Sequence, residues 1–179
     1  MGIKKTLRME QLAKRKELSL SYRQTAEKTM LTKLIAMPEY QKSEMIFCYI
    51  GMEEEINTWQ FIEYFLSDNK RVCVPKVVAP DEMELREIMC DSCLVRSSFG
   101  VLEPTEENML VNSKSVDLVL VPCITANRQG DRLGYGGGFY DRFLKESQAM
   151  SVLCIWKKML FDAIPVEEHD VKVKKVITE

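Results

Sequence analysis

Apolar residues recur at helical spacing along the first part of the chain. The residues that set this period are Ile3, Leu7, Leu12, Met30, Leu31, Leu34 and Ile35. Their spacing predicts one helix over residues 2–16 and a second over residues 21–37. Ser21 with Gln24 fits a capping box for the second helix, and Pro38 is expected to end that helix.

Short apolar runs farther along the chain predict strands. The predicted strands cover residues 45–50, 71–75, 116–122 and 151–156, with an edge or hairpin strand at 83–88. Thr58 is expected to cap a helix that ends near Ser67. Strands separated by helices predict a Rossmann-like α/β fold, in which three α/β/α layers surround a largely parallel central sheet. The length predicts a single domain over residues 1–179.

The most unusual stretch is GDRLGYGGGFYDRFL, over residues 130–144, which has glycines at 134, 136, 137 and 138 and is followed by a predicted helix from Phe139 to Lys145. Free backbone N–H groups ahead of a helix N-terminus form a site for phosphate or another anion. Arg132 and Arg142 add cations, and Asp141 is a candidate magnesium ligand. A flexible linker or a tight strand-to-helix turn is the alternative, but linkers are rich in Ser and Gly, whereas this loop has aromatic and charged residues.

The charge of the chain is uneven. The net charge of −2 and the pI of about 5.7 argue against a nucleic-acid binder, for which a basic face is expected. Residues 1–33 nevertheless contain nine Lys and Arg residues against three Glu residues. A solvated helix face, a membrane-surface helix and part of an anion site are all compatible with this excess. Lys4 and Arg8 are four residues apart, so they share one face of the helix.

The cysteines and the apolar runs indicate a cytoplasmic protein without a membrane span, because no run is long enough to cross a bilayer and the N-terminus lacks a signal-peptide core. Cys48, Cys73, Cys123 and Cys154 lie in or beside apolar runs and are expected to be buried. The C-x-x-C of residues 90–93 has no further pair of ligands and the only histidine is His169, which disfavours zinc or redox chemistry there.

The glycine stretch matches neither a Walker A loop nor the dinucleotide pattern G-x-G-x-x-G. It resembles the G-x-R-L-G-x-G-x-G-Y-Y-D signature of the 5-formyltetrahydrofolate cyclo-ligase family, with Phe139 in place of one Tyr. The matching residues are Gly130, Arg132, Leu133, Gly134, Gly136, Gly138, Tyr140 and Asp141. Lys4 with Arg8, Glu55 in E-x-x-T, and Asp170 in P-V-x-x-x-D also fit this family. The chain departs from it at residues 123–129 and at Lys158 and Met159.

The resemblance implies a set of site residues. It implies ATP binding by Lys4, Lys5, Arg8, Arg132, Leu133, Gly134, Tyr135, Gly136, Gly137, Gly138, Phe139 and Tyr140. It implies folate binding by Ile50, Glu55, Tyr135, Gly136, Gly137, Gly138 and Phe139. Mg²⁺ is expected at Asp141 and Asp170, and catalytic roles at Arg132, Tyr140 and Lys4. Without the resemblance, Asp170 and His169 are a weak signal and both are expected at the surface.

The implied reaction is the ATP- and Mg²⁺-dependent closure of 5-formyltetrahydrofolate to 5,10-methenyltetrahydrofolate, through a phosphorylated formyl group. The expected partners are small molecules, with no nucleic acid or membrane, and the expected state is a monomer or weak homodimer. One alternative is a nucleotide- or folate-binding protein without turnover. Another is a different ATP- or sugar-phosphate-dependent enzyme on the same scaffold, since a fold alone does not fix function.

Overall fold

The computed structural model describes residues 2–89, 94–96 and 100–179, and its centre is a seven-stranded sheet in the order β11-β10-β7-β1-β2-β3-β6. The strands of this sheet are β1 (Met45–Phe47), β2 (Arg71–Ala79), β3 (Glu82–Ile88), β6 (Leu110–Val111), β7 (Leu118–Leu120), β10 (Met150–Cys154) and β11 (Lys175–Ile177). Two small antiparallel sheets pair β4 (Leu94–Arg96) with β5 (Leu102–Pro104) and β8 (Thr125–Ala126) with β9 (Arg132–Leu133).

The strands from β11 to β2 are parallel, and β3 and β6 are antiparallel additions at one side. From β1 the chain moves outward to β2 and β3, and it later returns to β7 on the other side of β1 and moves outward again to β10 and β11. The connection therefore reverses direction between β1 and β7. In open α/β sheets, ligands bind outside the carboxyl ends of the strands at such a switch point.

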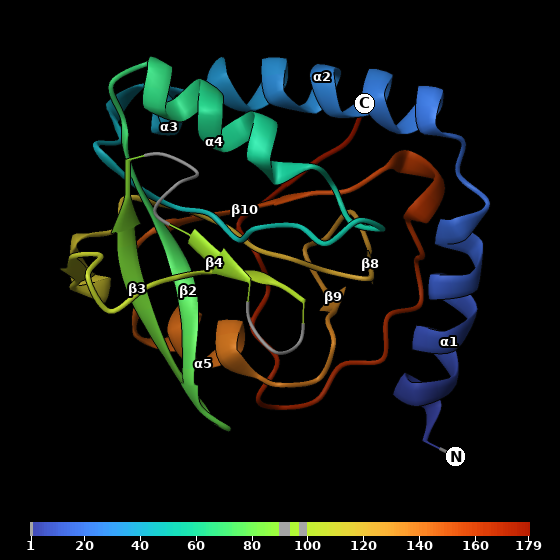
Figure 1. The fold of residues 1–179 in the computed structure, drawn as a ribbon. Helices are drawn as coiled ribbons and strands as arrows, with labels where there is room; N and C mark the ends of the chain where they lie inside the picture. Colours follow the sequence, from blue (N-terminus) through green and yellow to red (C-terminus); the bar gives the residue numbers. More distant parts are fainter. Residues whose placement is uncertain (1, 90–93, 97–99) are drawn as a thin grey trace.

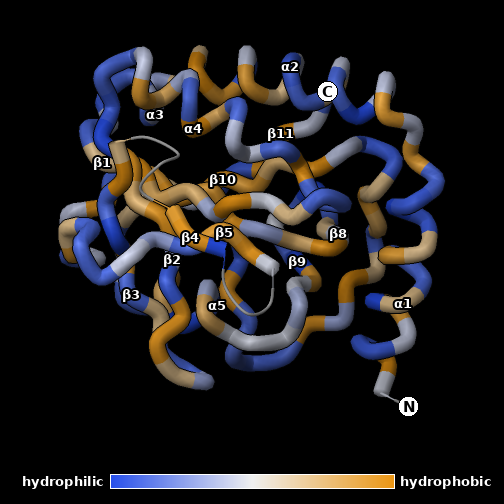
Figure 2. The backbone as a smooth tube through the Cα atoms, in the orientation of Figure 1, coloured by the Kyte–Doolittle hydropathy of each residue, from blue (hydrophilic) through white to orange (hydrophobic). Residues whose placement is uncertain are grey.

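Helices cover both faces of the sheet. Figure 1 shows α2 (Leu20–Ile35), α3 (Pro38–Lys42) and α4 (Thr58–Ser67) along one face and α5 (Phe139–Glu146) against the other, with α1 (Ile3–Lys16) beside β8 and β9. Short 3-10 turns cover Ser113–Ser115 and Lys157–Met159. In the hydropathy colours of Figure 2, apolar residues gather on the central strands, whereas the helices carry both apolar and polar residues, as expected for a sheet covered by helices. The arrangement confirms the α/β architecture expected from the pattern.

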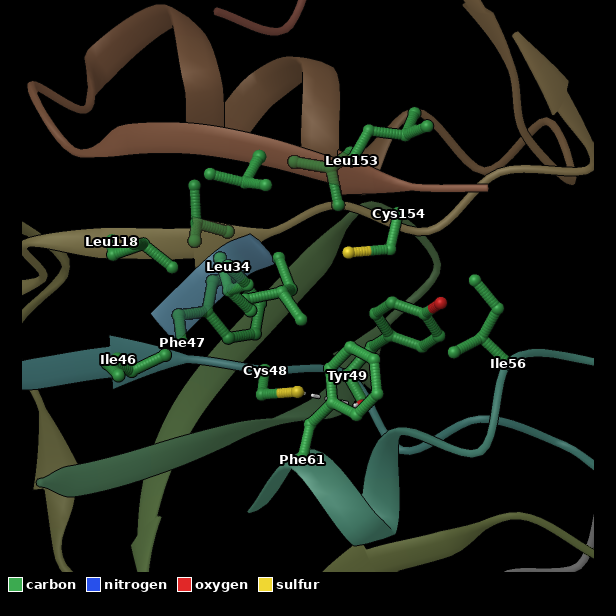
Figure 3. Close-up of a cluster of buried hydrophobic side chains, with 14 of the residues drawn as sticks. Leu34, Ile46, Phe47, Cys48, Tyr49, Ile56, Phe61, Leu118, Leu153 and Cys154 are labelled. Carbon is green, nitrogen blue, oxygen red and sulfur yellow. Dashed lines mark hydrogen bonds between the residues drawn. The ribbon is translucent and has the colours of Figure 1, made fainter. Parts of the chain in front are cut away.

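The core lies on both sides of β1. On the α5 side, the Phe47 ring stacks on Tyr140, with ring centroids 5.4 Å apart, and meets the edge of Phe143 at 5.1 Å. Figure 3 shows Leu34, Cys48 and Phe61 packed with residues of β7 and β10, and the three side chains are fully buried. The four described cysteines, Cys48, Cys73, Cys123 and Cys154, are free and buried, as predicted. The C-x-x-C prediction lies outside the described residues.

Three predictions about helix ends are wrong. Ser19, not Ser21, is the N-cap of α2, because its hydroxyl accepts the Tyr22 N–H at 3.3 Å. That helix ends at Ile35, and Pro38 begins α3 instead of ending α2, as its fixed φ and missing N–H allow. Thr58 is the first helical residue of α4, after Asn57 at the N-cap.

The strand predictions find the central strands but not the smaller pieces. The predicted buried strands exist with shorter bounds, except β2, which extends to Ala79 and forms a hairpin with β3. The sequence analysis missed β8 and β9, because strands of two residues leave no periodic signal. No helix in the described ranges is long and apolar enough to cross a membrane.

Candidate functional site

A cleft with a volume of about 510 Å³ opens at the carboxyl end of β7, where Pro122 forms part of its wall. The glycine loop lines this cleft together with the start of α1 and the segment near the C-terminus. The lining residues named by the sequence analysis are Lys4, Lys5, Arg8, Arg132, Leu133, Gly134, Tyr135, Gly136, Gly137, Gly138, Phe139, Tyr140, Asp141, His169 and Asp170. Three segments far apart in the sequence therefore meet at the switch point of the sheet.

The backbone of the glycine loop is held open for a ligand. Gly136 has φ of +102° and Gly138, the N-cap of α5, has φ of +69°, which are left-handed values that favour glycine. A Cβ atom at Gly136 would lie 3.3 Å from the guanidinium of Arg8. The N–H groups of Gly136, Gly137 and Gly138 donate to no other described residue. Free N–H groups ahead of a helix such as α5 are suited to an anion, and an anion site here stays a prediction.

Three of the basic residues that line the cleft, Lys4, Arg8 and Arg132, have hydrogen-bond partners. Lys4 Nζ donates to Asp170 Oδ2 at 2.7 Å and lies 3.3 Å from Glu167 Oε1. The guanidinium of Arg132, with a side chain only 5% exposed, donates to Asp141 Oδ1 at 2.9 Å and also to the carbonyl of Val171.

Arg8 Nε donates to the carbonyl of Gly134 at 2.8 Å. The two carboxylates predicted to bind Mg²⁺ are thus each paired with a cation predicted to bind phosphate.

The local environment fixes the charge state of two groups in the cleft. Burial alone would raise the pKa of Asp170, but hydrogen bonds from Lys4 and the Glu167 backbone, with the charge of Lys4, hold that pKa below its ordinary value. The Asp170 side chain is 19% exposed, so the expectation that it lies at the surface is wrong, whereas that of His169 is 61% exposed. Burial raises the pKa of Tyr140 well above its ordinary value. Its hydroxyl is buried and has no hydrogen-bond partner among the described residues.

Glu55 lies outside this cleft, in the wall of a second, much smaller cavity of about 10 Å³. It is 8% exposed and its Oε2 accepts the Met52 N–H at 3.0 Å, whereas the neighbouring Glu53 and Glu54 are exposed. The hydroxyl of Thr58 accepts the Gly51 N–H at 2.8 Å and donates to the Tyr49 carbonyl at 2.6 Å. Thr58 therefore holds the loop that presents Glu55.

Tyr135 connects the two cavities. Its backbone belongs to the glycine loop, and its hydroxyl accepts a hydrogen bond from Arg15 Nη1 at 3.2 Å. The pKa of Tyr135 is raised to about 12, mainly by burial and also by the negative charge of Glu55, and the positive charge of Arg15 opposes this shift. The hydroxyl is thus protonated at neutral pH and lies under the influence of charges from both sides.

Arg15 is a site residue that the sequence analysis missed. It is 2% exposed and donates to the carbonyls of Cys123 and Ile124 at 2.7 and 2.9 Å. It follows Arg8 by seven residues and Lys4 by eleven, so all three lie on one side of α1. The spacing from Lys4 and Arg8 is the sequence signal that could have identified Arg15. The basic excess of residues 1–33 alone does not single it out.

The wall next to Arg15 is the segment where the chain departs from the family pattern. Residues 123–127 are all buried. Thr125 donates to the Met159 carbonyl at 2.7 Å, and Asn127 Oδ1 accepts the N–H groups of Gln129 and Asp131 at 3.0 and 2.9 Å. The residues that depart from the family pattern therefore form a hydrogen-bonded hairpin. The carbonyls of Cys123 and Ile124 at its start face Arg15. Ile50 packs against the main core and does not line the large cleft.

The carboxylates fit a metal that is bound together with a phosphate ligand. Mg²⁺ keeps several waters and is commonly held by one or two carboxylates plus substrate phosphates. Asp141 uses Oδ1 in its hydrogen bonds to Arg132 and Val171, and its Oδ2 makes none to described residues. No group of three or more His, Cys, Asp and Glu residues suited to a metal occurs in the described part of the chain. A cage made of protein ligands alone is therefore not what these residues offer.

A largely parallel sheet with a cleft and a glycine loop at its switch point defines an α/β protein of the open-sheet class. The chain belongs to the 5-formyltetrahydrofolate cyclo-ligase family, whose profile matches residues 1–179. This is a family of ligases. The membership confirms the resemblance found in the glycine stretch.

Individual relatives extend over nearly the whole chain. The mouse 5-formyltetrahydrofolate cyclo-ligase is 26% identical over 189 residues, covering 98% of this chain and 93% of its own length. The solved Aquifex aeolicus 5,10-methenyltetrahydrofolate synthetase is 30% identical, with a TM-score of 0.86, and the match covers 98% of this chain and 89% of that one. The Mycoplasma pneumoniae synthetase, at 22% identity and a TM-score of 0.79 over 99% of each chain, shows the fold alone.

Proposed function

We propose that this protein uses ATP and Mg²⁺ to close 5-formyltetrahydrofolate into 5,10-methenyltetrahydrofolate, with release of ADP and phosphate. The observation that supports this proposal most directly is the cleft at the switch point, where an open glycine loop meets Lys4, Arg8 and Arg132. Those groups match the phosphates of a nucleotide in charge and in hydrogen-bond donors. Family membership supplies the reaction class.

The phosphate side of the cleft is largely preformed. The N–H groups of residues 136–138 would donate hydrogen bonds to the phosphate oxygens, and Lys4, Arg8 and Arg132 would neutralise the charge of the phosphates. Lys5, Leu133, Phe139 and the rest of the glycine loop would line the nucleotide. Phosphoryl transfer depends mainly on positioning and charge neutralisation, so no covalent nucleophile is required.

Asp141 and Asp170 would hold Mg²⁺ against these phosphates, and both line the cleft. Bound there, the ion would neutralise charge on the phosphates and help to orient them. Arg132 and Lys4 would then move from the two carboxylates to the phosphates. The cleft would exchange one set of ion pairs for another and leave no charge unpaired.

The folate side is formed by the Glu55 loop and the far side of the glycine loop. Glu55 would accept the N–H groups of the pterin, Ile50 would line the same pocket, and Tyr135 would bridge to the nucleotide. Tyr140 keeps its proton at neutral pH because burial raises its pKa, so it would act as a hydrogen-bond donor. An unpartnered buried hydroxyl is destabilising, and a polar atom of the substrate would satisfy it.

The proposed reaction has two steps. The formyl oxygen attacks the γ-phosphorus, the bond to ADP breaks, and the formyl carbon becomes an activated imidate phosphate. The N10 nitrogen then attacks that carbon and releases its proton to solvent, the bond between the carbon and the phosphate oxygen breaks, and inorganic phosphate departs as the five-membered ring of the methenyl product closes. Lys4 and Arg132 would act as catalytic residues by stabilising the negative charge of the transferring phosphoryl group.

An absorbance assay tests this function. The methenyl product has a conjugated chromophore that the substrate lacks. We expect absorbance to rise when protein, ATP, Mg²⁺ and 5-formyltetrahydrofolate are combined, and to stay flat when any one of them is omitted. Binding of both ligands without a rise would indicate a protein that has lost turnover, and the absence of folate binding would favour a different ATP-dependent activity.

A further inference from the structure

Arg15 is the most deeply buried cation whose contacts the proposed reaction does not use. It lies in the last turn of α1, one helix face along from Lys4 and Arg8, and only 2% of it is exposed. Its guanidinium donates to the carbonyls of Cys123 and Ile124, behind the end of β7, and to the hydroxyl of Tyr135 in the glycine loop. One side chain thus ties together α1, the wall of the cleft and the glycine loop.

This arrangement is costly for stability alone. The hydrogen bonds of Arg15 go to uncharged oxygens, and its Nε–H has no partner among the described residues. Burying a guanidinium without a carboxylate partner is unfavourable, and an apolar side chain of similar size would avoid that penalty. Glu55 shares with Arg15 the lining of the small cavity. A buried charge without a partner of opposite charge departs from what stability favours, and such departures occur mainly at functional sites.

Tyr135 stands between these two opposite charges. Its hydroxyl accepts a hydrogen bond from Arg15 at 3.2 Å, and the negative charge of Glu55 also acts on it. The hydroxyl remains protonated at neutral pH, so it can accept from Arg15 and donate toward Glu55 at once. Arg15, Tyr135 and Glu55 form a series that runs from the basic helix, through the phosphate loop, to the proposed pterin ligand.

We propose that Arg15 is a positioning residue that couples nucleotide binding to folate binding through the hydroxyl of Tyr135. This inference rests on the proposed function. Arg15, which lies outside the large cleft, would link the binding of nucleotide to the binding of folate. Phosphates bound to residues 136–138 fix the loop that carries Tyr135, and Arg15 fixes the hydroxyl relative to Glu55. Bound nucleotide thus orders the glycine loop before folate binds, so folate binds more tightly with nucleotide than without it. By linkage, bound folate raises the affinity for nucleotide by the same factor.

Calorimetry on the full chain tests this coupling. The dissociation constant of 5-formyltetrahydrofolate is measured with and without a non-hydrolysable ATP analogue plus Mg²⁺, and the ratio of the two values is the coupling factor. We expect a factor of at least about five in the wild type, the lower end of common couplings. Arg15→Met should bring the factor close to one. Lys14→Met, an exposed neighbour on α1, should leave it at the wild-type value.

The ratio separates positioning from general loosening of the fold, which weakens folate binding equally with and without nucleotide. If Arg15→Met does not fold, Tyr135→Phe gives the same test, because it removes only the hydroxyl of a half-exposed side chain. A factor near one in the wild type, or a factor retained in either variant, would overturn the coupling while leaving the proposed function intact. A wild type that binds only one of the two ligands would overturn both.

Discussion

The large cleft and the small cavity hold charged side chains in opposite ways. In the large cleft, cations and carboxylates neutralise each other directly, as in the pairs Lys4–Asp170 and Arg132–Asp141. In the small cavity, Arg15 and Glu55 are both buried, and each is bonded to uncharged groups instead of to the other. The first site is open to solvent and the second has a volume of only about 10 Å³.

The difference shows which side of the site is ready for its ligand. Ion pairs at an open cleft are exchanged for new ion pairs at little net cost, because the charges stay solvated or paired throughout. A cavity that holds about one water must be enlarged before a ring enters it, and its buried polar groups lose their present partners unless the ligand replaces them. We therefore expect nucleotide to bind the existing structure and folate to require rearrangement around Tyr135.

The largest effect is expected from breaking the ion pairs of the cleft at Arg132. Arg132→Ala removes a charge-assisted phosphate contact and leaves Asp141 without its partner. Loss of such a contact corresponds to roughly 1.5 to 3 kcal/mol, or about tenfold to a hundredfold in apparent KM for ATP, together with reduced turnover. Steady-state kinetics on a folded variant is the measurement, with the exposed Arg128→Ala as control. Unchanged ATP kinetics would exclude Arg132 from the site.

The next effect concerns the metal. Asp141→Asn keeps the shape of the side chain but removes the charge that a hard cation prefers. We expect the Mg²⁺ concentration at half-maximal rate to rise by about tenfold, equivalent to about 1.4 kcal/mol. Glu53→Gln, in the exposed acidic loop that contains Glu53 and Glu54, should change this Mg²⁺ concentration little. Mg²⁺ titrations of the two variants decide between these loops, and equal shifts would assign the ion to the acidic loop.

The sequence predicted the large cleft far better than the small cavity, for a physical reason. The cleft is built from a contiguous glycine motif and from Lys4 and Arg8, whose shared helix face follows from their spacing. Each of those signals is local, so a single sequence reveals it. The sequence assigns Asp170 to the same cleft only through the family motif, because Asp170 lies 166 residues along the chain from its partner Lys4.

The small cavity depends on contacts that no local pattern encodes. Arg15 reaches carbonyls 108 and 109 residues away, and these acceptors are backbone atoms, which are the same for every residue type. The hairpin of β8 and β9 that presents the Cys123 and Ile124 carbonyls consists of two-residue strands without periodicity. The prediction of the α2 N-cap is wrong for a different reason. Ser19 and Ser21 both suit an N-cap, and only the folded backbone selects between them.

A smaller effect is expected at Glu55, the acid of the small cavity. Glu55→Gln keeps the size and an acceptor oxygen for the Met52 N–H but removes the charge. An ordinary net hydrogen-bond contribution corresponds to a loss of folate affinity of about two- to tenfold, with ATP affinity nearly constant. Glu54→Gln, whose carboxylate meets only the exposed Lys16 at 3.4 Å, is the matched control. Calorimetric titration with each ligand tests this, and equal weakening of ATP would contradict the separation of the two sides.

The smallest effect is on the stability of the empty cleft. The pKa of Asp170 is lowered in the folded state, so its pairing stabilises the fold above the ordinary carboxyl pKa of about 3.9, and that stabilisation is lost as the pH falls through the folded-state pKa. Lys4→Gln should therefore lower the free energy of unfolding by about 0.5 to 1 kcal/mol at pH 7, as is usual for partly exposed pairs.

The same substitution should have a smaller effect near pH 3, because the stabilisation is lost as the pH falls toward and through the folded-state pKa of Asp170. Lys5→Gln, which removes a lysine that forms no ion pair with a described residue, should have little effect at either pH. Urea unfolding at the two pH values measures both. A loss at pH 7 that persists unchanged at pH 3 would mean that Lys4 stabilises α1 through its packing and not through Asp170. The cleft would then lack the exchangeable ion pair that distinguishes it from the cavity around Arg15.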